Sequence, residues 1–397
     1  MDRDELKAWL RLTLSPGIGN ITARKLLTTF GLPQAIFEQP AQTLRQVATA
    51  TQSQALQTEP TALAELLETT WTWLNESGSN DCQRQVLTLG DPGYPQALLE
   101  IDDPPLMLYL LGVASFNENQ TATTPWPVLS QRCLAIVGSR NPTPQGARNA
   151  RQFAKTLVQA GLTVVSGLAL GVDGAAHEGA LEGLTDGATN LPATLAVIGT
   201  GLDRVYPKAH HDLAHRIAQR GLLLSEYPLG TPPLNANFPK RNRLIAGLAR
   251  GTLVVEAALQ SGSLITARLT AEQGKDVFAI PGSIHATQSR GCHALIKQGA
   301  KLVESAQDVL EELQGFNALT AAMDSAATYT GLPRDECIVE GNAQVLNALG
   351  FDPVGLDALQ GRTQLETSDL QARLMTLELE GQVARLPGGL FQRLAGN

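Results

Sequence analysis

The stretch Leu134-Ala135-Ile136-Val137-Gly138-Ser139-Arg140 decides the fold of this chain. Its first four residues are apolar, as in a strand that is buried on both faces, and a helix-period segment begins near Pro144. Further apolar runs bounded by turn residues follow, most of them separated by helical segments; they lie at 163–166, 195–198, 222–225, 252–255 and 277–280. This alternation predicts an α/β protein with a Rossmann-like, doubly wound, mostly parallel sheet.

The loop Gly138-Ser139-Arg140 joins the first predicted strand to its helix and offers backbone N–H groups, a hydroxyl and a guanidinium to one phosphate. Ser166 and Gly167 follow the next strand and belong to the same sheet edge, where ligands bind in such folds. The alternative is a plain strand-to-helix turn with an exposed arginine. Neither GxGxxG nor the P-loop pattern GxxxxGK[ST] occurs, so we expect no dinucleotide cofactor and no P-loop ATPase.

The block Phe238-Pro239-Lys240-Arg241-Asn242-Arg243 places three cations and an amide beside an aromatic ring. Bases stack on aromatic rings, cationic side chains neutralise phosphates, and an amide hydrogen-bonds a backbone or a base edge. The pattern therefore favours a nucleic-acid strand as ligand. A solvated basic helix face is the alternative, although such a face needs neither the phenylalanine nor the proline.

Hydroxyls gather again after a later predicted strand, at Ser261-Gly262-Ser263 and Thr266. They suit a second anion, and they equally suit the cap of the helix that begins there. This block is therefore a candidate DNA contact with a structural alternative.

Two pairs with helical spacing, Asp173 with His177 and His211 with His215, lack an adjacent third ligand or nucleophile. Hydrogen-bonding or surface roles are the expectation for both pairs. The four cysteines are far apart, which indicates neither disulfides nor zinc. We expect no metal and no cofactor.

The charge of the chain is unevenly distributed. The 397 residues carry a formal net charge of −8, yet residues 132–315 hold 18 Lys and Arg against 14 Asp and Glu. Residues 1–131 hold 7 against 14, and residues 316–397 hold 5 against 10. Phosphate contacts should therefore be concentrated in a pocket of the central segment. No apolar run reaches the roughly 18 residues of a membrane span and the opening residues are charged, so a cytoplasmic protein is expected.

The sequence divides into three predicted domains. Residues 1–75 should form a helical domain of the helix-hairpin-helix or SAM-like kind, with helices at 5–14 and 21–30 around a glycine-containing turn; a structural hairpin for protein contact is the alternative. Residues 86–315 form the Rossmann-like domain and 316–334 a linker. Three helices and a hairpin at 335–397 suggest a winged helix. Its expected recognition helix, 368–380, is acidic, which favours protein contact over duplex binding.

Ordered motifs across residues 86–315 resemble the DNA-processing protein A (Smf) family. The motifs are IVGSR at 136–140, SGLALGVD at 166–173, GTGLD at 199–203, YP at 206–207, SEYP at 225–228, FPKRNR at 238–243, SGSLITA at 261–267, AEQG at 271–274 and PG at 281–282. One departure is Gly291-Cys292-His293, where a Ser-Asn-like pair is expected in the family.

The resemblance implies a single-stranded DNA-binding domain, without enzymatic activity, that protects incoming DNA and helps to load the RecA recombinase during natural transformation. It also implies a homodimer and contact with single-stranded DNA-binding protein. Carried over by position, the single-strand pocket would lie at Arg140 and at 238–243.

Two other classes of function stay open. A nucleotide-processing enzyme on a related fold would need a catalytic carboxylate, with Glu226 and Glu256 as candidates, although the central domain has no PGGxGT-type phosphate motif. A duplex-binding regulator would use both end domains, whose acidity argues against it. Binding of single strands that depends steeply on salt, with little preference for duplex, would distinguish the single-stranded DNA-binding protein from the duplex-binding regulator.

Overall fold

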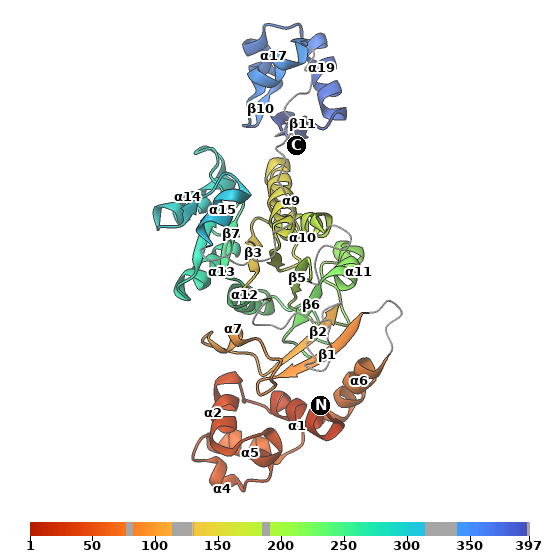
Figure 1. The fold of residues 1–397 in the computed structure, drawn as a ribbon, viewed down its shortest axis with the longest axis vertical. Helices are drawn as coiled ribbons and strands as arrows, with labels where there is room; N and C mark the ends of the chain where they lie inside the picture. Colours follow the sequence, from red (N-terminus) through yellow and green to blue (C-terminus); the bar gives the residue numbers. More distant parts are fainter. Residues whose placement is uncertain (77–81, 113–128, 130, 185–190, 314–339, 395–397) are drawn as a thin grey trace, which may run out of the picture.

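An N-terminal helical region precedes the sheet. The computed structural model describes residues 1–76, 82–112, 129, 131–184, 191–313 and 340–394, so the expected linker at 316–334 lies outside the described residues. The N-terminal helices are α1 (Arg3–Leu14), α2 (Asn20–Phe30), α3 (Pro33–Phe37), α4 (Ala41–Leu44), α5 (Ala50–Gln57) and α6 (Leu63–Asn75). They form the red and orange end of the molecule in Figure 1.

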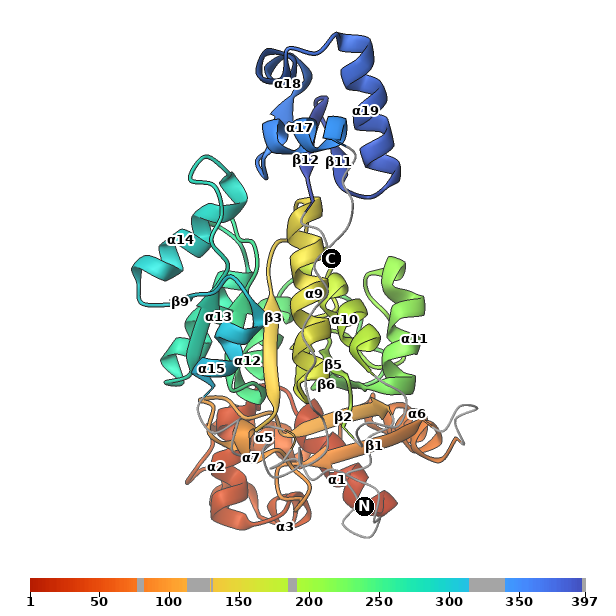
Figure 2. The ribbon, with the colours of Figure 1, turned by 45° about the horizontal axis from the view of Figure 1, so that its top comes forward.

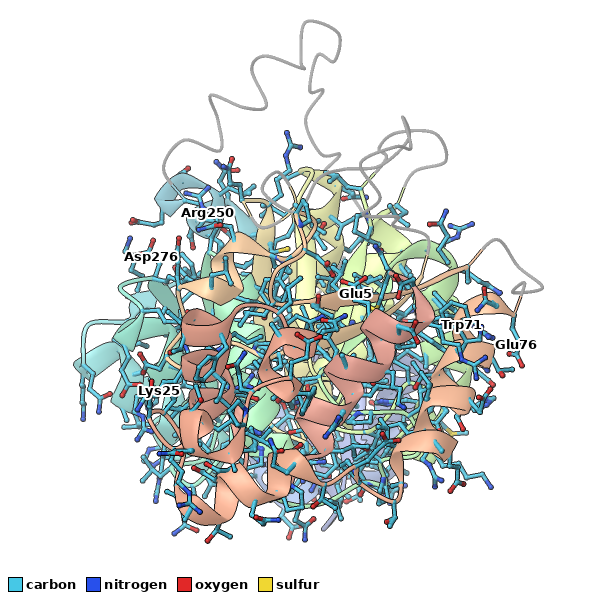
Figure 3. All side chains as sticks on the ribbon, turned by 90° about the horizontal axis from the view of Figure 1, so that it is seen from below. Glu5, Lys25, Trp71, Glu76, Arg250 and Asp276 are labelled. Atoms are coloured by element: carbon cyan, nitrogen blue, oxygen red, sulfur yellow. The ribbon has the colours of Figure 1, made fainter. Side chains whose placement is uncertain are left out.

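The turn between α1 and α2 packs against the sheet domain. Gly17 adopts a positive φ of 76°, which a glycine tolerates, and α2 begins at Asn20. The Asn20 amide donates to Asp103 Oδ2 at 3.2 Å, and Arg24 Nη2 donates to the Asp102 carbonyl at 2.8 Å. Seen from below, these helices lie in front of the sheet domain (Figure 3). Because acidic loop residues adjoin the first turn of α2, the arrangement favours the structural alternative for this hairpin.

The central sheet has nine strands among the described residues, in the order β1-β2-β6-β5-β4-β3-β7-β8-β9. Strands β3 to β9 run parallel, while β1 pairs antiparallel with β2 and β2 antiparallel with β6. The predicted α/β class with a mostly parallel sheet is confirmed. The strands are β1 (Gln83–Thr88), β2 (Met107–Gly112), β3 (Cys133–Val137), β4 (Thr163–Ser166), β5 (Thr194–Val197), β6 (Leu222–Ser225), β7 (Gly251–Val254), β8 (Asp276–Ala279) and β9 (Lys301–Leu302).

Sequence reasoning found β3 to β8 and missed the three outer strands. The run that forms β2 is almost continuously apolar, and periodicity alone does not distinguish such a run from a buried helix segment. Strand β9 is only two residues long. The antiparallel edge depends on the pairing of β2 with β6, which are far apart in sequence.

Helices cover both faces of the sheet. Residues of β3 alternate between the two cores: Leu134 and Ile136 pack in one, Ala135 and Val137 in the other. The first face carries α9 (Pro144–Gln159), α10 (Val172–Gly183), α11 (His211–Arg220) and α15 (Ala306–Glu312). The second carries α7 (Gln96–Leu99), α12 (Asn237–Leu248), α13 (Ser263–Glu272) and α14 (Arg290–Lys297). Connections from β3 and β7 therefore leave on opposite sides, and a switch point lies between these neighbours (Figure 2).

The C-terminal residues form a winged helix with its own small core. Its elements are α17 (Glu340–Leu349), β10 (Val354–Gly355), α18 (Leu356–Thr363), α19 (Thr367–Leu379), β11 (Val383–Leu386) and β12 (Leu390–Arg393), with strand order β10-β12-β11. It lies beyond the end of α9 (Figure 1), where Arg148 Nη2 donates to the Gly381 carbonyl at 2.9 Å. Helix α19, in the recognition-helix position, exposes Met375 and Leu379.

The close packing of α10 on α9 gives a test of the fold. A Cβ at Gly179 would overlap the backbone of Arg151 in α9. We expect Gly179→Ala to lower the free energy of unfolding by about 1–3 kcal/mol, despite the better helix propensity of alanine. Urea denaturation measures this. The control is Gly90→Ala, where no atom beyond residue 90 and its two chain neighbours lies within 4 Å of the added Cβ, and the change should stay within about 0.5 kcal/mol. Equal effects of both would contradict the proposed packing constraint.

Candidate functional site

A cavity of about 490 Å³ opens at the switch point between β3 and β7. One wall is the loop after β3, a second is the first half of α12, and the third is the loop after β7 with the first turn of α13. Open parallel sheets bind ligands at this place, because the loops that follow two neighbouring strands diverge there.

Most of the residues predicted from sequence line this cavity, and four do not. The lining includes Gly138, Ser139, Arg140, Phe238, Pro239, Arg241, Asn242, Ser261, Gly262, Ser263 and Thr266. Outside it are Ser166, Gly167, Lys240 and Arg243. The lining also contains the polar side chains of Asn141, Gln260 and Gln288, for which no sequence pattern gave a signal.

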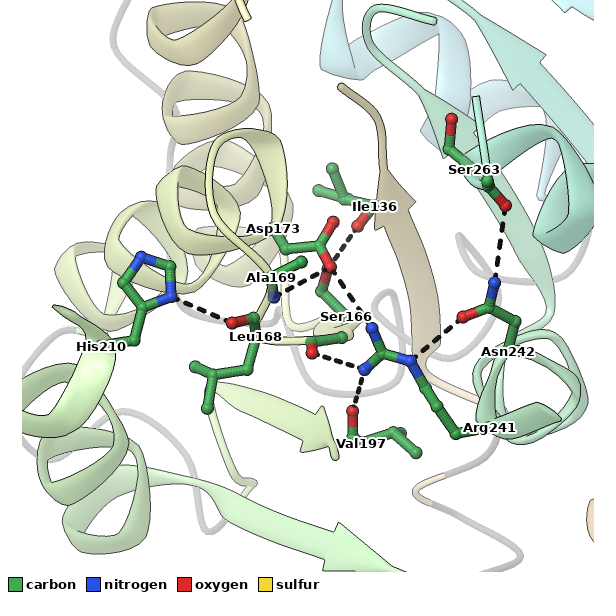
Figure 4. A network of polar contacts seen from close by, with 12 residues as sticks. Ile136, Ser166, Leu168, Ala169, Asp173, Val197, His210, Arg241, Asn242 and Ser263 are labelled. Carbon is green, nitrogen blue, oxygen red and sulfur yellow. Dashed lines mark hydrogen bonds and ion pairs between the residues drawn. The ribbon is translucent and has the colours of Figure 1, made fainter. Parts of the chain in front are cut away.

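Arg241 is buried and holds the site together from within. Its side chain is 5% exposed, and Nη1 donates to the carbonyls of both Gly167 and Val197 (Figure 4). Nε donates to Asn242 Oδ1 at 3.1 Å, and Nη2 lies 4.0 Å from Asp173 Oδ2. This differs from the predicted role in neutralising phosphate, because the guanidinium is engaged by groups of the protein. It connects α12 to the ends of β4 and β5.

Burial shifts the titration of this pair in opposite directions. It raises the pKa of Asp173, against the effect of Arg241 and of the Ala169 N–H, which donates to Asp173 Oδ2 at 3.3 Å. It lowers the pKa of Arg241, against the effect of Asp173. Asp173 is the only carboxylate among the residues that line the cavity, and it faces this cation.

Ser166 and Gly167 lie behind the cavity wall. The buried Ser166 hydroxyl donates to the Ile136 carbonyl at 2.7 Å and thereby links β4 to β3. A Cβ at Gly167 would overlap the Arg241 guanidinium. These two residues support the site through Arg241 and the sheet, and the structure does not bring them to the cavity surface.

Lys240 and Arg243 lie on another side of α12. Arg243 makes ion pairs with Glu226 and with Asp103, the latter at 3.3 Å. Lys240 lines a smaller cavity, of about 140 Å³, between the N-terminal helices and the sheet domain. The three cations of the basic block thus face two different surroundings, and only Arg241 adjoins the predicted pocket.

A tier of exposed and half-buried side chains borders the cavity. Among the described residues Arg140 makes no ion pair, and its Cζ lies 6.0 Å from the centroid of the Phe238 ring. The ring of Tyr206, 50% exposed, lies 5.4 Å from that of Phe238 at an angle of 37°. Tyr206 was not a site residue in the sequence prediction. Its position after the β5 loop, at the ligand-binding edge, was the available signal.

The wall from α13 is polar and carries no side-chain cap. Gly262 is the N-cap of α13, and Ser261 Oγ lies 2.7 Å from Ser263 Oγ. Asn242 Nδ2 makes a long contact of 3.5 Å with the Gly262 carbonyl. Of the serine cap that the sequence allowed, the structure shows only a long hydrogen bond from Ser263 N to Ser261 Oγ, at 3.4 Å. The hydroxyls of Ser261 and Ser263 line the cavity.

The two glutamates considered for catalysis do not line this cavity. Glu226 pairs with Arg243. Glu256 accepts from Thr143 N at 2.9 Å and from Thr143 Oγ1 at 2.6 Å, and burial raises the pKa of Glu256 against these hydrogen bonds. Neither carboxylate is placed to act on a ligand in the pocket between β3 and β7.

The two pairs with helical spacing, Asp173 with His177 and His211 with His215, make hydrogen bonds and ring contacts within the protein. His177 is buried, and because Thr194 Oγ1 donates to the Val164 carbonyl, His177 Nδ1–H donates to Thr194 Oγ1 at 2.7 Å. His211 and His215 contact each other at the surface. Within the described ranges there is no group of three potential metal ligands, and no helix there is long and apolar enough to cross a membrane.

Fold and site together define an α/β protein with a polar pocket at the switch point of a Rossmann-like sheet, joined to a winged helix. The model of the DNA recombination-mediator protein A family matches residues 85–314, and that of the DprA winged helix domain matches residues 340–389. The chain belongs to the DNA recombination-mediator protein A (DprA/Smf) family.

Relatives and a solved structure agree with this assignment. Protein Smf of Synechocystis sp. is 38% identical over 333 residues, which cover 78% of this chain and 80% of that protein. DNA processing protein DprA of Streptococcus pneumoniae is 47% identical over 224 residues, 56% of this chain and 72% of that protein. The X-ray structure of DprA from Streptococcus pneumoniae superimposes with a TM-score of 0.61 at 36% identity, covering 79% of this chain and 98% of that one.

The burial of Arg241 predicts a contrast between two arginines of the same pocket. Arg241→Ala leaves Asp173 without its cation and two carbonyls without their donor, so the free energy of unfolding should fall by about 3–5 kcal/mol. Arg140→Ala, at an exposed position, should change it by less than about 0.5 kcal/mol. Urea denaturation followed by circular dichroism checks both. A small loss for Arg241→Ala would show that the network does not stabilise the fold.

The buried His177 predicts that acid destabilises the protein. Burial lowers the pKa of His177 to about 3 from an ordinary 6.5, so the folded state excludes a proton that the unfolded state binds. This contribution to stability is complete above pH 6.5 and is lost as the pH falls toward 3. Between about pH 7.5 and 5 the loss should be about 2 kcal/mol, measured by urea denaturation. His177→Gln should remove this part of the pH dependence, and His211→Gln should retain it.

Proposed function

We propose that this chain binds single-stranded DNA and prepares it for homologous recombination by RecA. The observation that carries the proposal is the tier of exposed Arg140 and Tyr206 with half-buried Phe238, beside a polar cavity at the switch point. A single strand presents phosphates and unstacked bases together, and this tier offers a cation and two aromatic rings to them.

The geometry supports a strand that passes along the edge of the sheet. Arg140 would neutralise a phosphate, while the rings of Phe238 and Tyr206, 5.4 Å apart, would contact successive bases. The amide of Asn242 and the hydroxyls of Ser261 and Ser263 lie on the opposite wall and would hydrogen-bond the backbone or base edges. Duplex DNA keeps its bases stacked inside and makes poor use of such a tier.

In this proposal the bound DNA undergoes no reaction, and no covalent bond is made or broken. The lining carboxylate, Asp173, faces Arg241, and Glu226 and Glu256 make their contacts elsewhere. The description of the matched family as recombination mediators supports delivery of the bound strand to the recombinase. A homodimer that holds two stretches of DNA, and contact with single-stranded DNA-binding protein, complete the proposal. The acidic winged helix, with its exposed α19, would serve protein contact or regulation.

The first test is fluorescence anisotropy of a labelled dT oligonucleotide and its duplex across a salt series. Wild type should prefer the single strand. Arg140→Ala should weaken binding and reduce the slope of log affinity against log salt by about 0.7, since one phosphate contact is lost. The control is Arg268→Ala, an exposed arginine on α13 that pairs with Glu272. Equal affinity of wild type and Arg140→Ala, or absence of binding by wild type, would refute the assignment.

Tyr206 should contribute through its ring. Tyr206→Ala is expected to cost about 1–3 kcal/mol of binding free energy to the dT oligonucleotide, and Tyr206→Phe should retain most of the affinity. The same anisotropy assay at constant salt measures both variants. The slope against salt should be unchanged in Tyr206→Ala, because no cation is removed. Loss of affinity in both variants alike would indicate that the hydroxyl, and not stacking, makes the contact.

A further inference from the structure

The N-terminus of α9, the helix that follows β3, is already occupied by a carboxylate of the protein itself. Helix α9 begins at Pro144 after the N-cap Thr143, and its first turn contains no acidic residue of its own. A carboxylate is nevertheless present at this helix end, because Glu256 accepts from Thr143 N and from Thr143 Oγ1. The Thr143 hydroxyl in turn accepts from Gly146 N at 3.0 Å, so the charge of Glu256 is linked to the first turn of the helix.

The shape of the helix end fits this carboxylate. A Cβ at Gly146 would overlap the carboxylate group of Glu256, so the absence of a side chain at 146 makes the space that Glu256 fills. The Glu256 backbone is fixed as well, because its carbonyl accepts from Ser139 N at 2.7 Å. Glu256 is thereby held between the loop after β3 and the start of α9, on the helix side of that loop.

We propose that Glu256 determines ligand specificity by occupying the position that a phosphate monoester would take at the N-terminus of α9. Rossmann-like folds place the phosphates of nucleotides at this helix end, where backbone N–H groups and the helix dipole favour negative charge. Here the N–H groups of Thr143 and Gly146 are satisfied internally, and a second anion would meet both the volume and the like charge of the Glu256 carboxylate. A nucleotide phosphate is therefore excluded from this helix end.

The same exclusion directs a phosphodiester toward the other side of the loop. Arg140, Asn242 and the first turn of α13 remain available there and line the cavity. The inference deepens the proposed function, because it gives a reason why the site would take a DNA chain and not a mononucleotide. The inference rests on the proposed function only for the identification of the ligand as DNA.

Thermal unfolding of the full chain with inorganic phosphate or dTMP, each at millimolar concentration and at ionic strength balanced with chloride, tests the proposal. Glu256→Ala and Glu256→Ser vacate the position, whereas Glu256→Gln keeps it filled. Relative to the response of wild type, phosphate should raise the Tm of the Ala and Ser variants by about 2–4 °C and leave that of the Gln variant unchanged. If the Ala variant folds only when phosphate or formate is added, that rescue supports the proposal in the same way as a rise in Tm.

The matched control is Glu272→Ala, which removes an exposed carboxylate from α13 and should leave the response to phosphate at the wild-type level. An equal shift in wild type and variants would overturn the proposal, as would a folded Ala or Ser variant without any gain. Anisotropy with the dT oligonucleotide is measured in parallel. Failure of wild type to bind it would contradict the proposed function, while the phosphate comparison would still decide the role of Glu256.

Discussion

The arrangement of the site depends on one buried guanidinium. Arg241 donates to the carbonyls at the ends of β4 and β5 and faces Asp173 of α10, so one side chain connects two strands and two helices. A buried cation of this kind is tolerated only because its hydrogen-bonding groups find partners. Its position fixes the rotation of α12 about its own axis. That rotation decides which side chains of the helix reach the cavity.

Helical geometry then divides the basic block. With about 3.6 residues per turn, Phe238, Arg241, Asn242 and Ile245 lie toward the cavity, whereas Lys240 and Arg243 turn toward the N-terminal helices. Arg243 is neutralised there by Asp103 and Glu226, which connects α12 to the loop that contacts α2. The six-residue block thus positions α12 from two sides and contributes one aromatic ring and one amide to the exposed surface of the pocket.

Internal charge compensation recurs around the site. Asp173 compensates Arg241, Glu226 compensates Arg243, and Glu256 compensates the positive end of α9. Arg140 remains the exposed cation of the lining, which agrees with a central segment that is only slightly basic and with a chain that is acidic as a whole. In the proposed function, affinity for DNA would come from a few well-placed contacts and from stacking, since residues 132–315 hold only 18 Lys and Arg against 14 Asp and Glu.

The sequence by itself determined the strands β3 to β8, the Rossmann-like class, the winged helix and the place of the pocket. These follow from local apolar periodicity and from the rule that strand ends share one edge of a sheet. Only the tertiary structure decided that Arg241 is buried, that Tyr206 joins Phe238, that Glu256 fills the end of α9, and that β1 and β2 extend the sheet. Each of these depends on contacts between residues distant in sequence. A residue type shows the chemistry that a side chain offers, and the fold decides whether solvent or the protein itself uses it.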